Sequence, residues 1–358
     1  MSALRLCLLS LLSFSPFLAA QTSPAPTPTT QAAAPTADGK IHLDVLVRSA
    51  SGSGQAGLKE QDLTVLDDGH PQALSSFRAV AQGQEPAEII FVMDAANVRH
   101  TNLSYQQTQL QEFLRSMGKL PHPATIAVLG DQGVEIQKGF STDGQALSKV
   151  LDGYNAALRT ITRAAGFWGA TERLDLSLKG MSELTAYART LPGRKFLIWI
   201  SPGWPLLTGP GVELSNRQDK AIFDRVVAFS NELRDARVTV YDINPFGLEE
   251  PLINATYYEE FVKGVRRDQD AQLAYLGLQV MAVQSGGRTI TTNNDIKDGL
   301  KQCVSETSEW YEVTYPASPT EKPNQYHTIE VKVSDKGERP GVMARTRTGY
   351  YAQPLQQQ

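Results

Sequence analysis

The chain has 358 residues, of which 41% are hydrophobic, so it is long enough for a sizeable core or for two packed domains. Its formal net charge is −4 at pH 7 and its pI is about 5.8. This balance lacks the basic footprint of a nucleic-acid-binding protein, so we expect no nucleic-acid partner.

Residues 1–20 have the features of a secretory signal peptide. Arg5 precedes an apolar stretch, residues 6–20, which is too short to span a bilayer and ends in small residues. We predict cleavage after Ala20 and export, to the periplasm or as a secreted protein. Residues 21–39 are rich in Pro, Thr and Ala and have little to bury, which predicts a disordered linker.

Two further features constrain the mature chain. No later segment reaches the roughly 18 apolar residues of a membrane-spanning helix, so we predict no transmembrane segment there. Cys7 lies in the predicted signal peptide, which leaves Cys303 alone and predicts no internal disulfide. We expect Cys303 to be a small buried apolar side chain.

Both ends of the mature chain carry strand patterns. Near the start, residues 41–47 alternate apolar and other side chains, and residues 67–69 are a strong hairpin signal. Near the end, residues 327–333 alternate in the same way. Two or three short strands bury too little to be stable alone, so we predict that residues 40–82 and 309–353 pair in one small β-sandwich.

Between these segments, residues 86–305 alternate strand-like and helix-like runs. Such alternation implies βαβ crossovers, and it predicts an α/β fold: a doubly wound, mostly parallel, Rossmann-like sheet inserted in the β-sandwich. The expected strands are 88–93, 125–129, 134–139, 196–200, 238–243 and 288–291, and the expected helices are 104–119, 144–151, 173–190, 218–235, 269–284 and 294–305.

Several short segments, in a fixed order, carry a resemblance to a known family. They are residues 58–72, the strand that ends at Asp94, and residues 169–171, 196–203, 238–247, 285–288, 311–315 and 347–351. Their order and spacing resemble a von Willebrand factor type A domain and, more narrowly, the VWFA-related family of exported bacterial, acidobacterial-type proteins. The resemblance covers nearly all of the mature chain and implies the same α/β fold.

Many type A domains bind Mg²⁺ or another divalent cation through an Asp-x-Ser-x-Ser run, a Thr and a second Asp, which supply the oxygen ligands that a hard cation needs. Carried over by position, this chain keeps Asp94 and a fitting Thr171. Ala96, Val98 and Pro202 occupy the other three positions and supply no side-chain oxygen. The resemblance therefore implies a degenerate metal site and no resident cofactor.

Alternatives remain open at this site. Asp94 and Thr171 could still hold Mg²⁺ or Mn²⁺, with Asn97 and Ser201 as nearby oxygens, although the family backbone would turn Asn97 away. Asp94 could instead cap a helix or accept hydrogen bonds from loop amides, and Thr171 could be the N-cap of a helix that starts at Glu172 or Arg173.

The loops expected at the same sheet edge are unusually apolar and aromatic. Residues 203–215 include Trp204, Leu206 and Leu207, and could form an exposed partner-binding surface or fold back onto the sheet. Aromatic side chains on neighbouring loops would suit protein recognition. The further candidates for partner binding are Phe167, Trp168 and Phe246.

These observations predict a non-catalytic, exported module that binds a protein or a cell-surface polymer. No nucleophile–base pair, zinc spacing or phosphate-binding loop is found in the sequence, so we expect no enzyme. The alternatives are a metal-dependent adhesion module of the same fold and a structural or assembly component of an envelope complex.

Overall fold

The computed structural model describes most of the chain from Gly39 onward. The predicted signal peptide, and the predicted linker up to residue 38, lie outside the described residues. Among the helices of the described part, none is long and apolar enough to cross a membrane. The described residues are 39–49, 54, 57–98, 100–154, 166–207, 214–245, 258, 261, 263–291, 295–320, 322–334 and 341–354.

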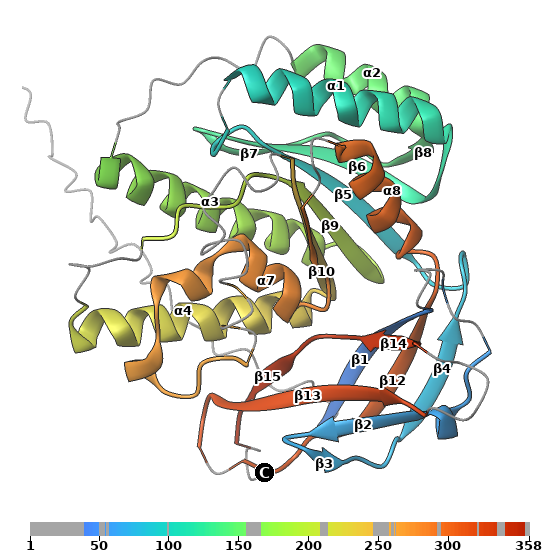
Figure 1. Ribbon diagram of the computed structural model, residues 1–358, viewed down its shortest axis with the longest axis vertical. Helices are drawn as coiled ribbons and strands as arrows, with labels where there is room; N and C mark the ends of the chain where they lie inside the picture. The colour runs from blue at the N-terminus through green and yellow to red at the C-terminus, as the bar shows by residue number, and fades with distance from the viewer. Residues whose placement is uncertain are drawn as a thin grey trace, which may run out of the picture. The chain divides into compact units, whose positions relative to one another are not determined.

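A seven-stranded, mostly parallel sheet forms the centre of the α/β part (Figure 1). Its strand order is β11-β10-β9-β5-β6-β7, with β8 paired to β6. Strands β7 and β8 run antiparallel to β6, and the other pairs are parallel. The predicted α/β class is confirmed. The strands are β5 (Ala87–Asp94), β6 (Lys119–Gly130), β7 (Gly133–Ile136), β8 (Ser141–Asp143), β9 (Arg194–Ile200), β10 (Val238–Asn244) and β11 (Thr289–Thr291).

Helices cover both faces of this sheet. One apolar cluster joins the sheet to α1, α2 and α8, and another joins it to α3, α4 and α7. Strand β5 shows why, because Ile89 and Phe91 belong to the first cluster while Ile90 and Val92 belong to the second. The helices are α1 (His100–Met117), α2 (Gly144–Tyr154), α3 (Gly166–Arg189), α4 (Asn216–Asp235), α7 (Leu278–Gln284) and α8 (Ile296–Ser305).

Two predicted helices differ from the structure. The helix expected at 269–284 is divided into two 3₁₀ turns, Asp268–Asp270 and Leu273–Leu276, followed by α7. Gly277 is extended (φ −72°, ψ 146°) between the second turn and α7, and a glycine inside a helix is unfavourable. Helix α3 begins at Gly166 instead of Arg173, because the intervening segment has no proline and Ala170 packs against the apolar cluster.

Two four-stranded antiparallel sheets combine strands from both ends of the chain. Their orders are β14-β1-β12-β4 and β15-β13-β2-β3. In the first, β1 pairs with β12 (Leu43 opposite Val313), and in the second, β2 pairs with β13 (Val65 opposite Val331). One apolar cluster contains buried side chains from both sheets. The strands are β1 (Lys40–Arg48), β2 (Leu63–Asp67), β3 (His70–Pro71), β4 (Ser76–Val80), β12 (Trp310–Pro316), β13 (Gln325–Val333), β14 (Met343–Arg345) and β15 (Gly349–Ala352).

The amino-terminal edge of the parallel sheet is joined to these antiparallel strands by ion pairs. Arg194, the first residue of β9, is buried, and its Nε lies 3.5 Å from Oδ2 of Asp44 on β1. Arg237, just before β10, contacts Asp44 Oδ1 at 2.9 Å and Glu312 Oε1 at 2.7 Å. The carboxyl-terminal edge of the sheet, which begins beyond Asp94, is therefore the opposite edge. Cys303 is buried, as predicted.

Candidate functional site

The strand order reverses between β5 and β9. In a doubly wound sheet, the crevice beyond the carboxyl ends of the strands at this reversal is the usual place for a ligand. Asp94 is the last residue of β5, and Ser201 directly follows β9. The sequence prediction that Asp94 ends a strand at this edge is confirmed.

The Asp94 carboxylate is fully buried and is held by hydrogen bonds from within the protein. Its Oδ1 accepts from the backbone N–H of Asn97 at 2.9 Å and from the Asn97 side-chain amide at 3.1 Å. Its Oδ2 accepts from the Asn97 amide at 2.9 Å, from Ser201 Oγ at 2.7 Å and from Trp199 Nε1 at 3.3 Å. Both oxygens thus have donors supplied by neighbouring residues.

Asn97 points toward Asp94, which corrects the expectation that it turns away. The bond from its backbone N–H to Asp94 closes a short turn of the kind that aspartate side chains favour. Its side-chain amide also donates to Ser177 Oγ on α3 at 2.8 Å. Asn97 therefore links the end of β5 to α3.

Asp242, inside β10, is a second buried carboxyl group that the sequence analysis did not single out. Burial, followed by the negative charge of Asp94, raises the pKa of Asp242 well above its usual value. Burial also raises the pKa of Asp94, against the opposing effect of the hydrogen bonds from Asn97 and Ser201. The signal that could have revealed Asp242 was a carboxylate in a strand that has no other charged residue.

Thr171 is half-buried and lies inside α3, so it is not the N-cap of that helix. Ser177, further along α3, accepts a hydrogen bond from Asn97 through its hydroxyl and so connects the helix to the Asp94 cluster. The structure therefore brings together Asp94, Asn97 and Ser201 from the predicted set, and it adds Trp199 and Ser177.

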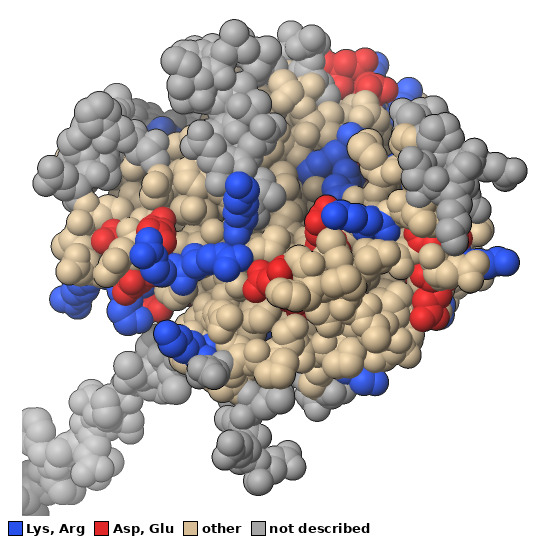
Figure 2. All heavy atoms as spheres, turned by 60° about the horizontal axis from the view of Figure 1, so that its bottom comes forward, with Lys and Arg blue, Asp and Glu red and all other residues tan. Residues whose placement is uncertain are grey.

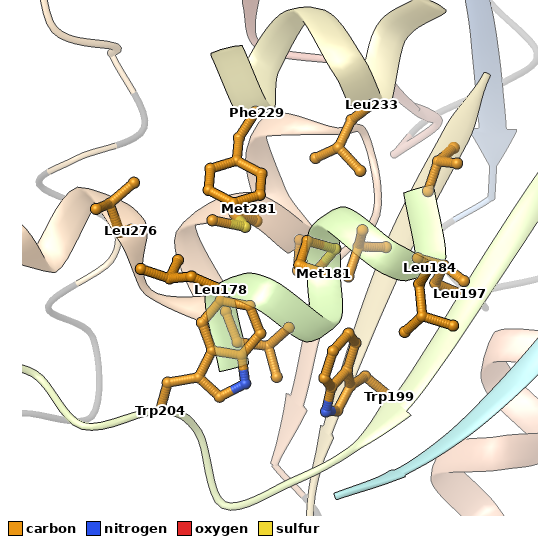
Figure 3. Packing of buried hydrophobic residues seen from close by; sticks show 14 of the residues in the cluster. Leu178, Met181, Leu184, Leu197, Trp199, Trp204, Phe229, Leu233, Leu276 and Met281 are labelled. Carbon is orange, nitrogen blue, oxygen red and sulfur yellow. The ribbon is translucent and has the colours of Figure 1, made fainter. Parts of the chain in front are cut away.

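The described start of the 203–215 loop folds back against the sheet. Trp204 is 4% exposed and packs edge-to-face on Trp199, with ring centroids 5.4 Å apart. Figure 3 shows both indoles among apolar side chains of α3, α4 and α7. Leu207 is buried in the same cluster, and Leu206 packs against a smaller one. The burial of Trp204 and Leu207 favours the alternative that this part of the loop folds back onto the sheet, because a large apolar side chain gains most free energy when it is buried.

Trp168, near the start of α3, is 79% exposed. Among the described residues, two other large hydrophobic side chains are exposed, but less so: Tyr105 at 38% and Met343 at 67%. The side chain of Phe167, and the whole of Phe246, lie outside the described residues. Trp168 is therefore the predicted partner-binding aromatic that the structure places at the surface.

A pocket of about 740 Å³ lies elsewhere, and most of its charged side chains are paired within the protein. Lys220 pairs with Asp224 at 2.9 Å, and Arg267 pairs with Asp270 at 2.7 Å. Figure 2 shows basic and acidic side chains interspersed on the face of the molecule that it draws. The pocket is lined by Lys220, Phe223, Asp224, Arg266, Arg267, Asp268, Pro319, Lys322, Pro323, Asn324 and Gln325.

No protein-family model matches the sequence, and no curated protein matches it. Among solved structures, proximal thread matrix protein 1 from the mussel byssus is 11% identical with a TM-score of 0.33, over 67% of this chain and 50% of that one. The N-terminal domain of TFIIH p34 is 14% identical with a TM-score of 0.32, over 62% and 97%. Manganese-loaded TRAP protein of Plasmodium vivax is 11% identical with a TM-score of 0.33, over 79% and 97%.

This chain therefore spans about half the length of the mussel protein, and likenesses at this level carry no functional argument. The fold class rests on the strand order of the molecule itself. A doubly wound α/β sheet with flanking antiparallel sheets agrees with the type A-like fold that the sequence resemblance implies.

Proposed function

We propose that the protein is an exported, non-catalytic interaction module that binds another protein or a surface polymer without a metal ion. The observation that carries this proposal is the state of Asp94, which is fully buried and accepts hydrogen bonds from Asn97, Trp199 and Ser201. In this proposal the antiparallel sheets (residues 40–82 and 309–353) form a β-sandwich that supports the α/β domain (residues 86–305).

The hydrogen bonds to Asp94 oppose the binding of a hard cation. Mg²⁺ needs several oxygen ligands, including waters, around a nearly octahedral centre. Asn97 and Trp199 instead present N–H groups to Asp94, and an N–H group cannot coordinate a metal. The orientation of the Asn97 amide follows from its surroundings, since its nitrogen faces three acceptor atoms, two on Asp94 and one on Ser177.

The same contacts support a non-catalytic role. Ser201 donates its proton at 2.7 Å to Asp94 Oδ2, an oxygen that also accepts hydrogen bonds from Asn97 and Trp199, and these bonds make it a weaker base. A serine held in this way is a structural donor. This supports the expectation from the sequence that the edge performs no chemistry.

Trp168 is the side chain that we propose contacts the partner. Helix α3 runs back along the sheet before β9, so its first turn lies near the carboxyl edge of the parallel strands. Ser177 touches the Asp94 cluster through Asn97, and Trp168 lies about 13 Å further toward the helix start at 1.5 Å per residue. An exposed indole at this position can supply an aromatic anchor for binding.

Calorimetric titration of the protein with Mg²⁺, Mn²⁺ and Ca²⁺ tests the metal-free part of the proposal. We expect no binding heat and no shift of the thermal midpoint that depend on Asp94. Binding in the micromolar to low millimolar range that disappears in Asp94→Ala would overturn it and would favour a metal-dependent adhesion module.

Site-specific photo-crosslinking in the producing cell tests the surface. We expect a discrete adduct with a crosslinking amino acid at position 168 and none at position 343, where the exposed apolar residue Met343 on β14 is the control. Identical adducts at both positions, or none at either, would contradict an interaction surface at the start of α3.

A further inference from the structure

A second cluster of titratable side chains lies in the antiparallel sheets, away from Asp94. Asp67 ends β2, Asp68 begins the following turn, and His327 lies on the neighbouring strand β13. Each offers one ligand atom, and these atoms all lie within 4.8 Å of one another. His327 Nδ1 is 2.9 Å from Asp67 Oδ1 and 3.6 Å from Asp68 Oδ2.

The turn fixes the carboxylate of Asp68. Asp68 and Gly69 both have positive φ, 48° and 81°, as a tight two-residue hairpin requires. The backbone N–H of Asp68 donates to the carbonyl of Thr328 at 2.8 Å, and the N–H of Thr328 donates to Asp68 Oδ1 at 2.9 Å. Arg266 also contacts Oδ1, so Oδ2 is the oxygen that faces His327.

The carboxylate of Asp67 is oriented just as firmly. Its Oδ2 accepts hydrogen bonds from three hydroxyls, those of Tyr350 at 2.8 Å, Ser318 at 3.0 Å and Tyr315 at 3.2 Å. Its Oδ1 is left to face the imidazole. Outer hydrogen bonds that fix one oxygen and direct the other are the usual support of a carboxylate that binds a metal.

His327 is held in the cluster through one ring nitrogen. The residue is 5% exposed, and its ring stacks on Tyr350 with centroids 5.1 Å apart. Its Nε2 is buried and has no hydrogen-bond partner, so the only polar anchor of the ring is Nδ1, which faces the two carboxylates. The ring is therefore oriented so that Nδ1, and not Nε2, is the nitrogen that an ion shared with the two carboxylates would contact.

We propose that Asp67, Asp68 and His327 bind a divalent transition-metal ion of the zinc class. Zinc binds nitrogen and oxygen ligands at about 2.0–2.1 Å, which places tetrahedral ligand atoms roughly 3.3 Å apart. The distances of 2.9 and 3.6 Å from Nδ1 to the two carboxylates lie on either side of that separation. Two carboxylates and a neutral imidazole also balance the charge of a divalent cation.

The donor set selects among cations. One imidazole nitrogen and two carboxylates suit Zn²⁺ or Co²⁺, whereas Mg²⁺ and Ca²⁺ prefer all-oxygen sites with six or more ligands. The side chain of Asp68 is 28% exposed, so the fourth position opens toward solvent on its side. The site is independent of the proposed function at Asp94.

Cobalt titration of the metal-stripped full-length protein tests the proposal, because four-coordinate Co²⁺ has intense visible bands that an aquo ion lacks. We expect such bands at one equivalent, displaced by Zn²⁺, and no calorimetric binding of Mg²⁺ at this site. His327→Gln and Asp68→Asn should weaken zinc binding by at least about 100-fold, since loss of outer-sphere partners alone weakens it about 10–100-fold.

Two variants complete the design. Tyr350→Phe removes one hydroxyl from Asp67 and should weaken zinc binding about tenfold while keeping the cobalt bands. His42→Gln, at an exposed histidine of β1, should leave the affinity unchanged.

Absence of cobalt bands in the wild-type protein would overturn the proposal and leave a plain Asp–His pair. Bands of full intensity in a folded His327→Gln variant would overturn it equally. The wild-type spectrum decides even if Asp68→Asn fails to fold. Asp94→Asn should leave zinc binding unchanged. The test of the zinc site is therefore independent of the test of the proposed function.

Discussion

Asp94 and Asp67 are both buried aspartates at the last position of a strand, yet their surroundings shift the pKa values of the two carboxyl groups in opposite directions. Asp94 receives only neutral N–H and O–H donors and lies near a second buried carboxyl, Asp242, and its pKa is raised by burial. Burial also opposes ionisation of Asp67, but hydrogen bonds from His327 and Tyr350 outweigh it and lower the pKa.

The difference shows what offsets the burial of a carboxylate. Amide and hydroxyl dipoles satisfy the oxygens of Asp94 without supplying positive charge, so its ionised form remains costly. Asp67 has an imidazole beside it, which can carry a proton or a metal ion. The oxygens of Asp94 are satisfied by neutral donors of the protein alone. The carboxylate of Asp67 instead faces a position that a positive charge can occupy.

The largest expected effect is at Asp67. Asp67→Asn removes the charged acceptor of three hydroxyls and leaves His327 without its partner, so we expect a loss of about 3 kcal/mol in the free energy of unfolding. Urea denaturation at pH 7 measures it. Ser318→Ala, which removes one of these donors, should cost only about 1 kcal/mol. Equal losses in the two variants would contradict the central role of the Asp67 charge.

The next largest effect concerns the donors of Asp94. Asn97→Ala removes the amide that bonds both Asp94 oxygens and Ser177, so we expect a loss of about 2 kcal/mol in unfolding free energy. Ser177→Ala removes the bond from Asn97 and a bond within α3 to the carbonyl of Arg173, and it should cost about 1 kcal/mol. An unchanged free energy of unfolding in Asn97→Ala would mean that water replaces the amide. The Asp94 carboxylate would then not depend on donors from the protein, as we infer that it does.

Asp242 should make stability depend on pH. A carboxyl group whose pKa is higher in the folded than in the unfolded chain adds stability that is complete below about pH 4 and is lost as the pH rises through the folded pKa. Asp242→Asn removes this dependence, so from pH 5 to pH 8 the variant should gain at least about 1 kcal/mol relative to the wild type.

Denaturation at several pH values across this range measures the gain, with Glu135→Gln as the control at an exposed carboxylate. Parallel curves for Asp242→Asn and the wild type would show that Asp242 is not a source of the pH dependence.

The smallest effect on stability is expected at Trp168. Because this indole is 79% exposed, Trp168→Ser should change the unfolding free energy by less than about 0.5 kcal/mol, while it removes the proposed contact with the partner. Thermal denaturation and partner binding, measured on the same sample, separate the two effects. A large loss of stability would assign Trp168 to packing and not to binding.

The sequence predicted the Asp94 cluster but not the Asp67 cluster. Asp94 could be found because a buried strand and its end are local patterns, and the alternation of strands and helices indicated the doubly wound sheet. The partners of Asp67 could not be found, since His327 is 260 residues away in the chain. A pattern of period two predicts that residues 327–333 form a strand, but it does not show which strand lies beside it.

Local sequence patterns also could not predict whether the apolar loop after β9 is buried or exposed. Trp204, Leu206 and Leu207 have the same composition whether they cover the sheet or face solvent, and only the space between β9, α4 and α7 decides between these arrangements. The turn that directs Asn97 toward Asp94 depends in the same way on one hydrogen bond that the sequence does not display.

The pairing of β1 with β12 and of β2 with β13 has a consequence for biosynthesis. The first two strands leave the ribosome well over 200 residues before their partners, as the pairing of Leu43 with Val313 illustrates. Until the rest of the chain has been made, these strands keep unpaired edges that can associate with other chains. Formation of the antiparallel sheets should therefore be the late step of folding, with the high contact order that slows it.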